Sequence, residues 1–361
     1  MRDVSRKWPV AAKPVGQILL KLGDGDQEDP KRNLSAGTRV GNTLFLAGDE
    51  MAVLEAVTMD GTGSSVAHHR YPLADLLDLL APEAEVDIEG LSAEAGWLWV
   101  VGSHARTRNK PDKAADLKID LHKLADLKDT RPRCVLGRIP LVENPPGSGA
   151  FHPVRADGER RAGLVRQTKR GSKLAVLLRR DRLLAPFTAI PAKEGGIDIE
   201  GIAVSGSRVA LGLRGPVIRD FAVLLEVTVE ASASGRLKLG SPLMKRLLDL
   251  EGLGIRDLKR RGDDLLILAG PTSSLSGPCA LYVWRDWGNE PASGHETVAL
   301  HRPERLLDLP FGRGTDHPEG LALWGGEDGN ERILVLCDSP ALDRFSKGPG
   351  TFLADLFALP E

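Results

Sequence analysis

The stretch Asp198-Ile199-Glu200-Gly201-Ile202-Ala203-Val204 decides the fold, because its pattern occurs at three other places in the sequence. In every copy, acidic residues and a glycine precede an apolar residue, and a turn and an apolar strand follow. Two short strands joined by a turn are typical of a β-hairpin. The other copies open at Asp87-Ile88-Glu89-Gly90-Leu91, Asp249-Leu250-Glu251-Gly252-Leu253 and Asp316-His317-Pro318-Glu319-Gly320-Leu321.

The spacing of the copies indicates the architecture. A degenerate copy has Ser35 where the others have glutamate, and the following intervals are 54 residues to Glu89, 111 to Glu200, 51 to Glu251 and 68 to Glu319. A period of about 50 residues that starts with a hairpin is what a four-stranded propeller blade requires. Since 111 is close to two periods, we predict an all-β propeller of about six four-stranded blades, and five or seven blades also fit.

The repeat also suggests the domain organisation. Residues 1–34 form an N-terminal segment in which Gly16 to Lys21 is a candidate strand for closing the ring against the last blade. Residues 35–361 form one propeller domain. Leucines at helical spacing predict partly helical insertions near residues 105–130 and 160–186, on the propeller face, where loops are longest.

Composition excludes several classes of protein. Among 361 residues, 48 Lys and Arg nearly balance 50 Asp and Glu, so no general field attracts polyanions or anionic membranes. No apolar run is long enough for a signal peptide or a membrane span, and the three cysteines lack paired spacing. We expect a cytoplasmic monomer that binds neither nucleic acid nor membrane, and whose partner is a small-molecule substrate or a protein or peptide.

The repeated glutamates are the candidate site. The first strand of each propeller blade faces the central channel, so equivalent positions converge around the axis. Carboxylates that converge repel one another and require a cation. We therefore expect a cluster of four: Glu89, Glu200, Glu251 and Glu319.

Three arrangements satisfy this requirement. A divalent calcium or magnesium ion binds the glutamates, with Asp49, Glu50, His104 and Asp338 as further candidate ligands. Alternatively, Arg214 or Arg256 neutralises the ring in a structural network. In the third arrangement, each carboxylate caps backbone amides of the adjacent blade and does not face the channel.

The specific catalytic motifs are absent, so the sequence indicates no single reaction. Two functions are compatible with these alternatives. The first is metal-assisted hydrolysis of a phosphate ester or a lactone, in which the glutamates hold the ion, His104 or Asp338 manages protons and Arg214 steadies an anionic substrate or oxyanion. The second is a non-catalytic scaffold that binds a peptide or protein on the propeller face. The basic run Lys259 to Arg261 is expected in a solvated turn.

Four blocks of sequence resemble a bacterial family known as domain of unknown function 3616: Gly196 to Gly201, Gly212 to Val217, Gly252 to Leu258 and Leu266 to Thr272. The resemblance covers most of the chain, from about Ser35 to Phe357, and implies no activity. More distantly, the Glu-Gly-Leu openings are similar to those of phytase-like esterase and gluconolactonase-type propellers. That similarity implies that a glutamate of the motif is a metal ligand in the channel.

Overall fold

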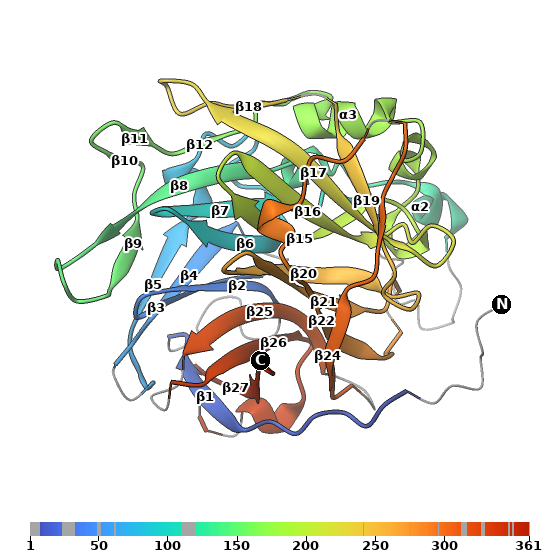
Figure 1. The fold of residues 1–361 in the computed structure, drawn as a ribbon. Helices are drawn as coiled ribbons and strands as arrows, with labels where there is room; N and C mark the ends of the chain where they lie inside the picture. Colours follow the sequence, from blue (N-terminus) through green and yellow to red (C-terminus); the bar gives the residue numbers. More distant parts are fainter. Residues whose placement is uncertain are drawn as a thin grey trace.

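The computed structural model describes residues 8–23, 33–48, 52–60, 63–109, 120–240, 242–273, 275–294, 296–311, 316–325, 329–345, 347–348 and 350–360. Within them, five main sheets are arranged as the blades of a propeller (Figure 1). The prediction of an all-β propeller is confirmed, and the number of blades is five rather than six.

The first three blades are described here from the channel outward. Blade 1 contains β2 (Leu34–Val40), β3 (Thr43–Gly48), β4 (Val53–Met59) and β5 (Ser65–Pro72). Blade 2 contains β6 (Ile88–Glu94), β7 (Trp97–Gly102), β8 (Leu136–Glu143) and β12 (Gly163–Leu164), with β9 (Phe151–Pro153) also paired to β8. Blade 3 contains β15 (Asp198–Ser205), β16 (Arg208–Gly215), β17 (Ala222–Ala231) and β19 (Met244–Leu248), with β18 (Leu237–Leu239) on β17 and β23 (Leu300–His301) on β19.

The last two blades complete the ring. Blade 4 contains β20 (Gly254–Arg261), β21 (Asp264–Gly270), β22 (Cys279–Trp284) and β24 (Glu304–Leu309). Blade 5 contains β25 (His317–Gly325), β26 (Glu331–Asp338), β27 (Thr351–Ala358) and, as its outermost strand, β1 (Gly16–Lys21). β1 pairs antiparallel with β27, and Figure 1 shows this blue strand among the red strands of the C-terminal blade. Both ends of the chain therefore build one sheet.

The interval of 111 residues between Glu89 and Glu200 contains one blade instead of two. After β8, the chain forms two small hairpins, β10 (Ala156–Asp157) with β11 (Arg160–Arg161) and β13 (Gln167–Thr168) with β14 (Gly171–Ser172). Helix α3 (Lys173–Arg180) and two 3-10 turns follow. The other helices are α1 (Leu73–Leu76), after blade 1, and α2 (Leu121–Ala125), between β7 and β8. The insertion therefore has nearly the length of a blade, and this explains why the spacing favoured six blades over the five observed.

In the described part of the chain, five hydrophobic cores hold the blades together, one between each pair of neighbours around the ring. The first strands also contact one another in the cyclic order β2, β6, β15, β20, β25. Gly201 shows how close this contact is, because a Cβ atom there would lie 2.9 Å from the backbone nitrogen of Leu258 in the next blade. The glycine of the repeated motif therefore permits close packing around the channel.

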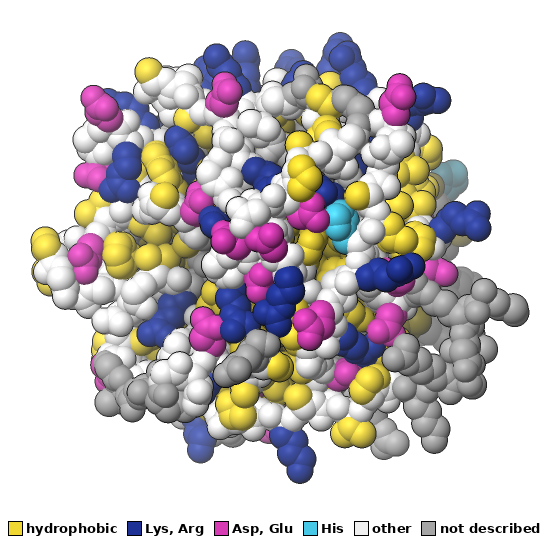
Figure 2. All heavy atoms as spheres, in the orientation of Figure 1, with side chains coloured by type: hydrophobic (Ala, Val, Ile, Leu, Met, Phe, Trp, Pro, Cys, Tyr) yellow, Lys and Arg dark blue, Asp and Glu magenta, His cyan; other side chains and the backbone are white. Residues whose placement is uncertain are grey.

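The surface carries both signs of charge. Figure 2 shows basic and acidic side chains intermixed on the face in view, as expected from 48 Lys and Arg against 50 Asp and Glu. In the described part of the chain, no helix has the length and apolar character needed to cross a membrane.

Candidate functional site

One residue of each first strand lies outside the regular pairing with the second strand. Such a β-bulge redirects a side chain relative to the rest of its strand. In every blade, the bulge falls close to the beginning of the first strand, so the five residues mark one end of the channel, which we call the channel mouth. The bulge residues are Ser35, Glu89, Glu200, Arg256 and Glu319.

The predicted glutamate ring is therefore wrong in blade 4, where Arg256 and not Glu251 takes the equivalent position. Glu251 lies in the turn before β20 with a φ of 59°. Its carboxylate lies 2.9 Å from Nη1 of Arg305, on the outer strand β24. Glu251 and Gly252 have the sequence of the motif, but they lie before β20 begins, whereas the glutamate of the other copies lies within the first strand.

Arg256, in blade 4, forms ion pairs with residues of both neighbouring blades. Its Nε lies 3.0 Å from Oε2 of Glu200 in blade 3, and its Nη2 pairs with Glu319 in blade 5. Neither Nε of Arg256 nor Oε2 of Glu200 has an aligned hydrogen bond, so their contact is an ion pair without the directional component. The side chains of both residues are buried.

Arg214, near the end of β16, neutralises the same cluster from within blade 3. Its Nη1 lies 2.8 Å from Oε1 of Glu200, and its Nη2 donates to Asp198. Burial alone would lower the pKa of Arg214, but the charges of Asp198, Glu200 and Glu89 raise it above its ordinary value. Each carboxylate oxygen of Glu200 therefore faces a guanidinium group.

Two buried carboxyl groups at the mouth have unusual proton affinities. Burial raises the pKa of Glu200 to about 7, although Arg214 and Arg256 oppose the shift. Burial likewise raises the pKa of Asp87 to about 6, against the charge of Arg133, which pairs with it at 2.6 Å, and a hydrogen bond from Ser103. Both groups can therefore exchange protons near neutral pH.

The two predicted proton carriers lie in different surroundings. His104 is buried, with Nδ1 2.9 Å from the carbonyl of Gly102 and Nε2 3.2 Å from the hydroxyl of Ser172, which caps α3. Burial lowers the pKa of His104 to about 4, which favours a neutral imidazole that is held in place by these two contacts, and its catalytic role stays a prediction. Asp338 ends β26, where it is paired in register with His317 and accepts a hydrogen bond from Ser339.

The arrangement at the mouth corresponds to the second of the three predicted alternatives, pairing by Arg214 and Arg256. Among the described residues, no group of three or more His, Cys, Asp or Glu side chains is arranged to hold a metal ion. Asp49 and Glu50, two of the further candidate ligands, lie outside the described residues.

Lys259 is a channel residue that the sequence reasoning missed, because its basic run was expected to be solvated. It is buried, and its Nζ lies 2.7 Å from Oδ1 of Asp257 and 3.1 Å from the carbonyl oxygen of Leu91. Leu91 belongs to β6, which is not adjacent to β20 in the ring. Lys259 therefore connects two non-neighbouring blades inside the channel.

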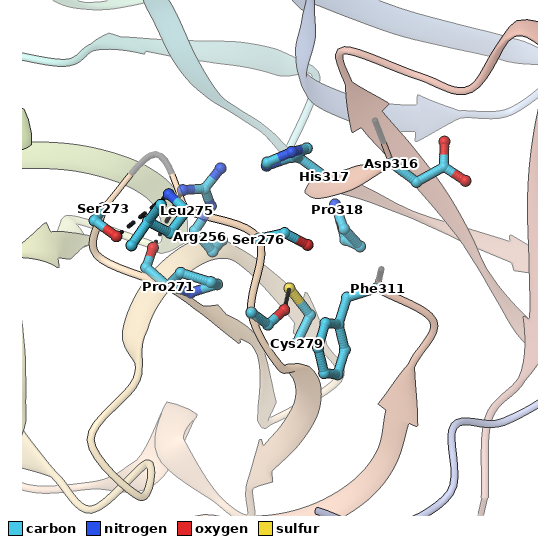
Figure 3. Close-up of a pocket in the computed structure, with 11 residues that line it drawn as sticks. Arg256, Pro271, Ser273, Leu275, Ser276, Cys279, Phe311, Asp316, His317 and Pro318 are labelled. Atoms are coloured by element: carbon cyan, nitrogen blue, oxygen red, sulfur yellow. Dashed lines mark hydrogen bonds between the residues drawn. The ribbon is translucent and has the colours of Figure 1, made fainter. Parts of the chain in front are cut away.

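A small pocket opens beside Arg256, between blades 4 and 5 (Figure 3). We call it the side pocket; its lining includes Arg256, Ser273, Leu275, Phe311, Asp316 and His317. In Figure 3, the carboxylate of Asp316 points away from the other side chains, and it is held by Arg344 at 3.0 Å. The volume of the side pocket is about 10 Å³, which is about the room that one water molecule requires.

The chain was compared with known families, with curated proteins and with solved structures. A family model described as protein of unknown function (DUF3616) matches residues 33–355. No curated protein matches the sequence.

Several solved structures are similar in fold at low identity. An exo-1,5-alpha-L-arabinanase from a bovine ruminal metagenomic library is 10% identical, with a TM-score of 0.40, over 92% of this chain and 95% of that chain. An exo-beta-1,3-galactanase from Phanerochaete chrysosporium is 10% identical, with a TM-score of 0.41, over 96% of this chain and 65% of that chain. A Bacteroides uniformis protein provisionally named as a 6-phosphogluconolactonase is 10% identical, with a TM-score of 0.31, over 83% and 62%. Similarity at this level carries no argument about chemistry.

Proposed function

The chain belongs to the DUF3616 family, which assigns it no reaction, and from the geometry of the channel mouth we propose that it hydrolyses small uncharged esters or lactones. The carrying observation is the carboxyl group of Glu200, whose pKa of about 7 places it close to neutrality. A general acid or base is most effective when its pKa lies near the working pH. Glu200 can therefore accept a proton from water and return it to a leaving group.

The environment of Glu200 fixes the position of its carboxyl group. Asp198 pairs with Arg214 through the same guanidinium that contacts Glu200. The partly buried arginines also supply hydrogen-bond donors of the kind that stabilise a developing oxyanion.

Charge favours an uncharged substrate over a phosphate ester. Among the described residues, the cluster contains six carboxyl groups, from Glu85, Asp87, Glu89, Asp198, Glu200 and Glu319, and three guanidinium groups, from Arg133, Arg214 and Arg256. A phosphate monoester brings up to two further negative charges into this excess, at a Coulomb cost that grows as water is excluded. A lactone or neutral ester avoids that cost.

The reaction needs only water as a co-reactant. The water oxygen bonds to the acyl carbon, the acyl carbon–oxygen bond of the ester breaks, and the proton lost by water passes through Glu200 to the departing alkoxide. Glu200 is 2% exposed, so the acyl group must approach it beside the guanidinium of Arg256, whose Nε lies 3.0 Å from Oε2. Because this contact is not an aligned hydrogen bond, the guanidinium can adjust its position while it stays next to Glu200.

The arginines also occupy the positions around Glu200 that a cation would otherwise take. We therefore include no calcium or magnesium ion in the proposed reaction. Hydrolysis that persists in EDTA supports this choice, and hydrolysis that EDTA abolishes and calcium or magnesium restores supports metal assistance instead.

A matched pair of variants tests the proposal. Purified protein is screened against neutral esters, lactones and phosphate esters, as wild type, Glu200→Gln and Glu226→Gln. Glu226 is also buried and paired with arginine, with Oε2 3.0 Å from Arg246, but it lies on the third strand of its blade. We expect Glu200→Gln to lose about 100-fold or more in rate and Glu226→Gln to keep its activity. Equal activity of wild type and Glu200→Gln, or no activity on any ester or lactone, contradicts the proposal.

A scaffold role is the second candidate, and exposed apolar residues favour it. Leu275, Phe311 and Leu342 are exposed in segments that follow strands of blades 4 and 5. Arginine pairing of the channel carboxylates is also compatible with a purely structural mouth. If the screen finds no hydrolysis, loss of peptide or protein binding on Leu275→Ser and Leu342→Ser supports this role.

A further inference from the structure

The guanidinium group of Arg256, which lines the side pocket, has N–H donors without a well-aligned acceptor. Nη1 of Arg256 donates to the carbonyl oxygen of Pro271 at 3.4 Å, near the upper limit for a hydrogen bond. Nε of the same guanidinium has no aligned partner among the described residues. An arginine has five N–H donors, and one that is buried gains by satisfying them. A ligand oxygen in the side pocket would provide a better acceptor than Pro271.

The lining of the side pocket indicates the size and polarity of such a ligand. The interior has room for one oxygen-sized group, and Ser273 and His317 add polar atoms around it. The rim is apolar, with Leu275 74% exposed and Phe311 42% exposed. The ligand is therefore a molecule whose single oxygen enters the pocket while its hydrocarbon portion lies against the rim.

Charge distinguishes a carbonyl oxygen from a carboxylate in this position. Arg256 already pairs with Glu200 and Glu319, so its positive charge is matched. Asp316 also lines the pocket, although Arg344 holds its carboxylate. A carboxylate ligand would add a charge close to these groups, whereas a carbonyl oxygen accepts hydrogen bonds without that repulsion.

We propose that the side pocket is the acyl subsite of this protein, where Arg256 donates to the carbonyl oxygen of an uncharged lactone or ester. The subsite rests on the proposed hydrolase function for its role, but not for its existence as a binding site. In this arrangement Arg256 contacts the carbonyl oxygen of the substrate and also Glu200, the group that transfers the proton. Arg256 is therefore a catalytic residue. Arg214, whose Nη atoms both serve carboxylates, keeps Asp198 and Glu200 in place instead.

The test measures binding separately from hydrolysis. The probe is δ-valerolactam, an uncharged, hydrolysis-resistant analogue of a lactone, and acetate is the charged comparison. Binding is followed by NMR of protein labelled with ¹³C-phenylalanine, in which the signal of Phe311 is assigned among eight phenylalanines from the spectrum of Phe311→Leu. We expect δ-valerolactam to shift the Phe311 signal in a saturable manner and to bind more tightly than acetate.

Two variants locate the site. Leu275→Trp fills the rim of the pocket, and Leu121→Trp is its matched control, because Leu121 is equally exposed at 74% and lies on α2. Leu275→Trp should raise the Kd of the lactam at least tenfold, and Leu121→Trp should leave it unchanged. Arg256→Lys should also raise the Kd, since lysine lacks the planar array of donors.

The outcomes separate the two proposals. Lactam binding that Leu275→Trp does not weaken, the absence of binding, or tighter binding of acetate overturns the subsite. Lactam binding that depends on Leu275 and Arg256, in a protein that hydrolyses nothing, preserves the subsite and overturns the hydrolase function.

Discussion

Arg256 occupies in blade 4 the position that Glu200 occupies in blade 3, and the two side chains meet at 3.0 Å across the boundary between the blades. The same bulge thus carries opposite charges in neighbouring repeats. A repeat that presented glutamate in both places would leave the channel with no cation between Glu200 and Glu319. Variation within the repeat therefore provides the neutralisation that sequence reasoning assigned to a metal or to arginine.

Replacing Arg256 with glutamine should destabilise the propeller by about 3–5 kcal/mol at neutral pH, because removal of one partner leaves buried carboxylates without their cation. The loss should shrink at pH 5, because Glu200, whose pKa is raised to about 7, takes up a proton there. Urea unfolding at both pH values measures the effect. Arg305→Gln, which removes a more exposed arginine from Glu251 and Asp308, should cost less. A loss that is independent of pH would contradict the explanation.

The pKa of Glu200 predicts a pH-dependent stability. Its folded pKa of about 7 lies above the ordinary value of 4.5, so the folded protein binds a proton more tightly than the unfolded chain. The corresponding stabilisation is present below about pH 4.5 and is lost as the pH rises through about 7. Relative to Glu200→Gln, the free energy of unfolding of the wild type should therefore fall between pH 5 and 8. Subtracting the two curves removes other titrating groups, and a difference that is flat or rises with pH would disprove this assignment.

Lys259→Met should cost about 3–5 kcal/mol, because Asp257 would remain buried without its cation. Asp257 would still accept hydrogen bonds from the backbone amides of Leu258 and Leu321. Adding Asp257→Asn should recover part of the loss, since it removes the uncompensated charge. Guanidinium unfolding of the single and double variants measures both steps. A single variant as stable as the wild type would show that Lys259 contributes little in this position.

His104→Asn should weaken the insertion without affecting proton transfer. Asparagine tolerates the φ of 54° at this position but loses the contact with Ser172, so we expect a loss of about 1 kcal/mol. The pH profile of any ester hydrolysis should be unchanged. A profile that loses a limb in His104→Asn would support the catalytic role first predicted for this histidine.

The sequence was sufficient for the fold class and for the bulge residues of four blades, because Glu89, Glu200 and Glu319 share one local pattern and Ser35 occupies the same place in a degenerate copy. It was insufficient in blade 4, where the bulge carries Arg256 and a nearby Glu-Gly turn imitates the motif. Counting from strands instead of glutamates would have found it: Ile255 to Leu258 precedes its second strand as Ile199 to Ile202 does.

Burial was the other quantity that the sequence did not reveal. Lys259 belongs to a basic run of three, yet it lies inside the channel because Asp257 and the carbonyl of Leu91 compensate its charge. The partner from β6 is 168 positions away in the chain. Contacts at such separation depend on how the blades close, which no local pattern reports.

The pairing of β1 with β27 affects folding during synthesis of the chain. Gln17 and Asp355 are hydrogen-bonded although 338 positions separate them. While the chain is being synthesised, β1 has no partner until β27 has left the ribosome. An edge that stays open so long is a site for mispairing with other chains, and this makes the unpaired β1 the strand that depends most on rapid synthesis of β27.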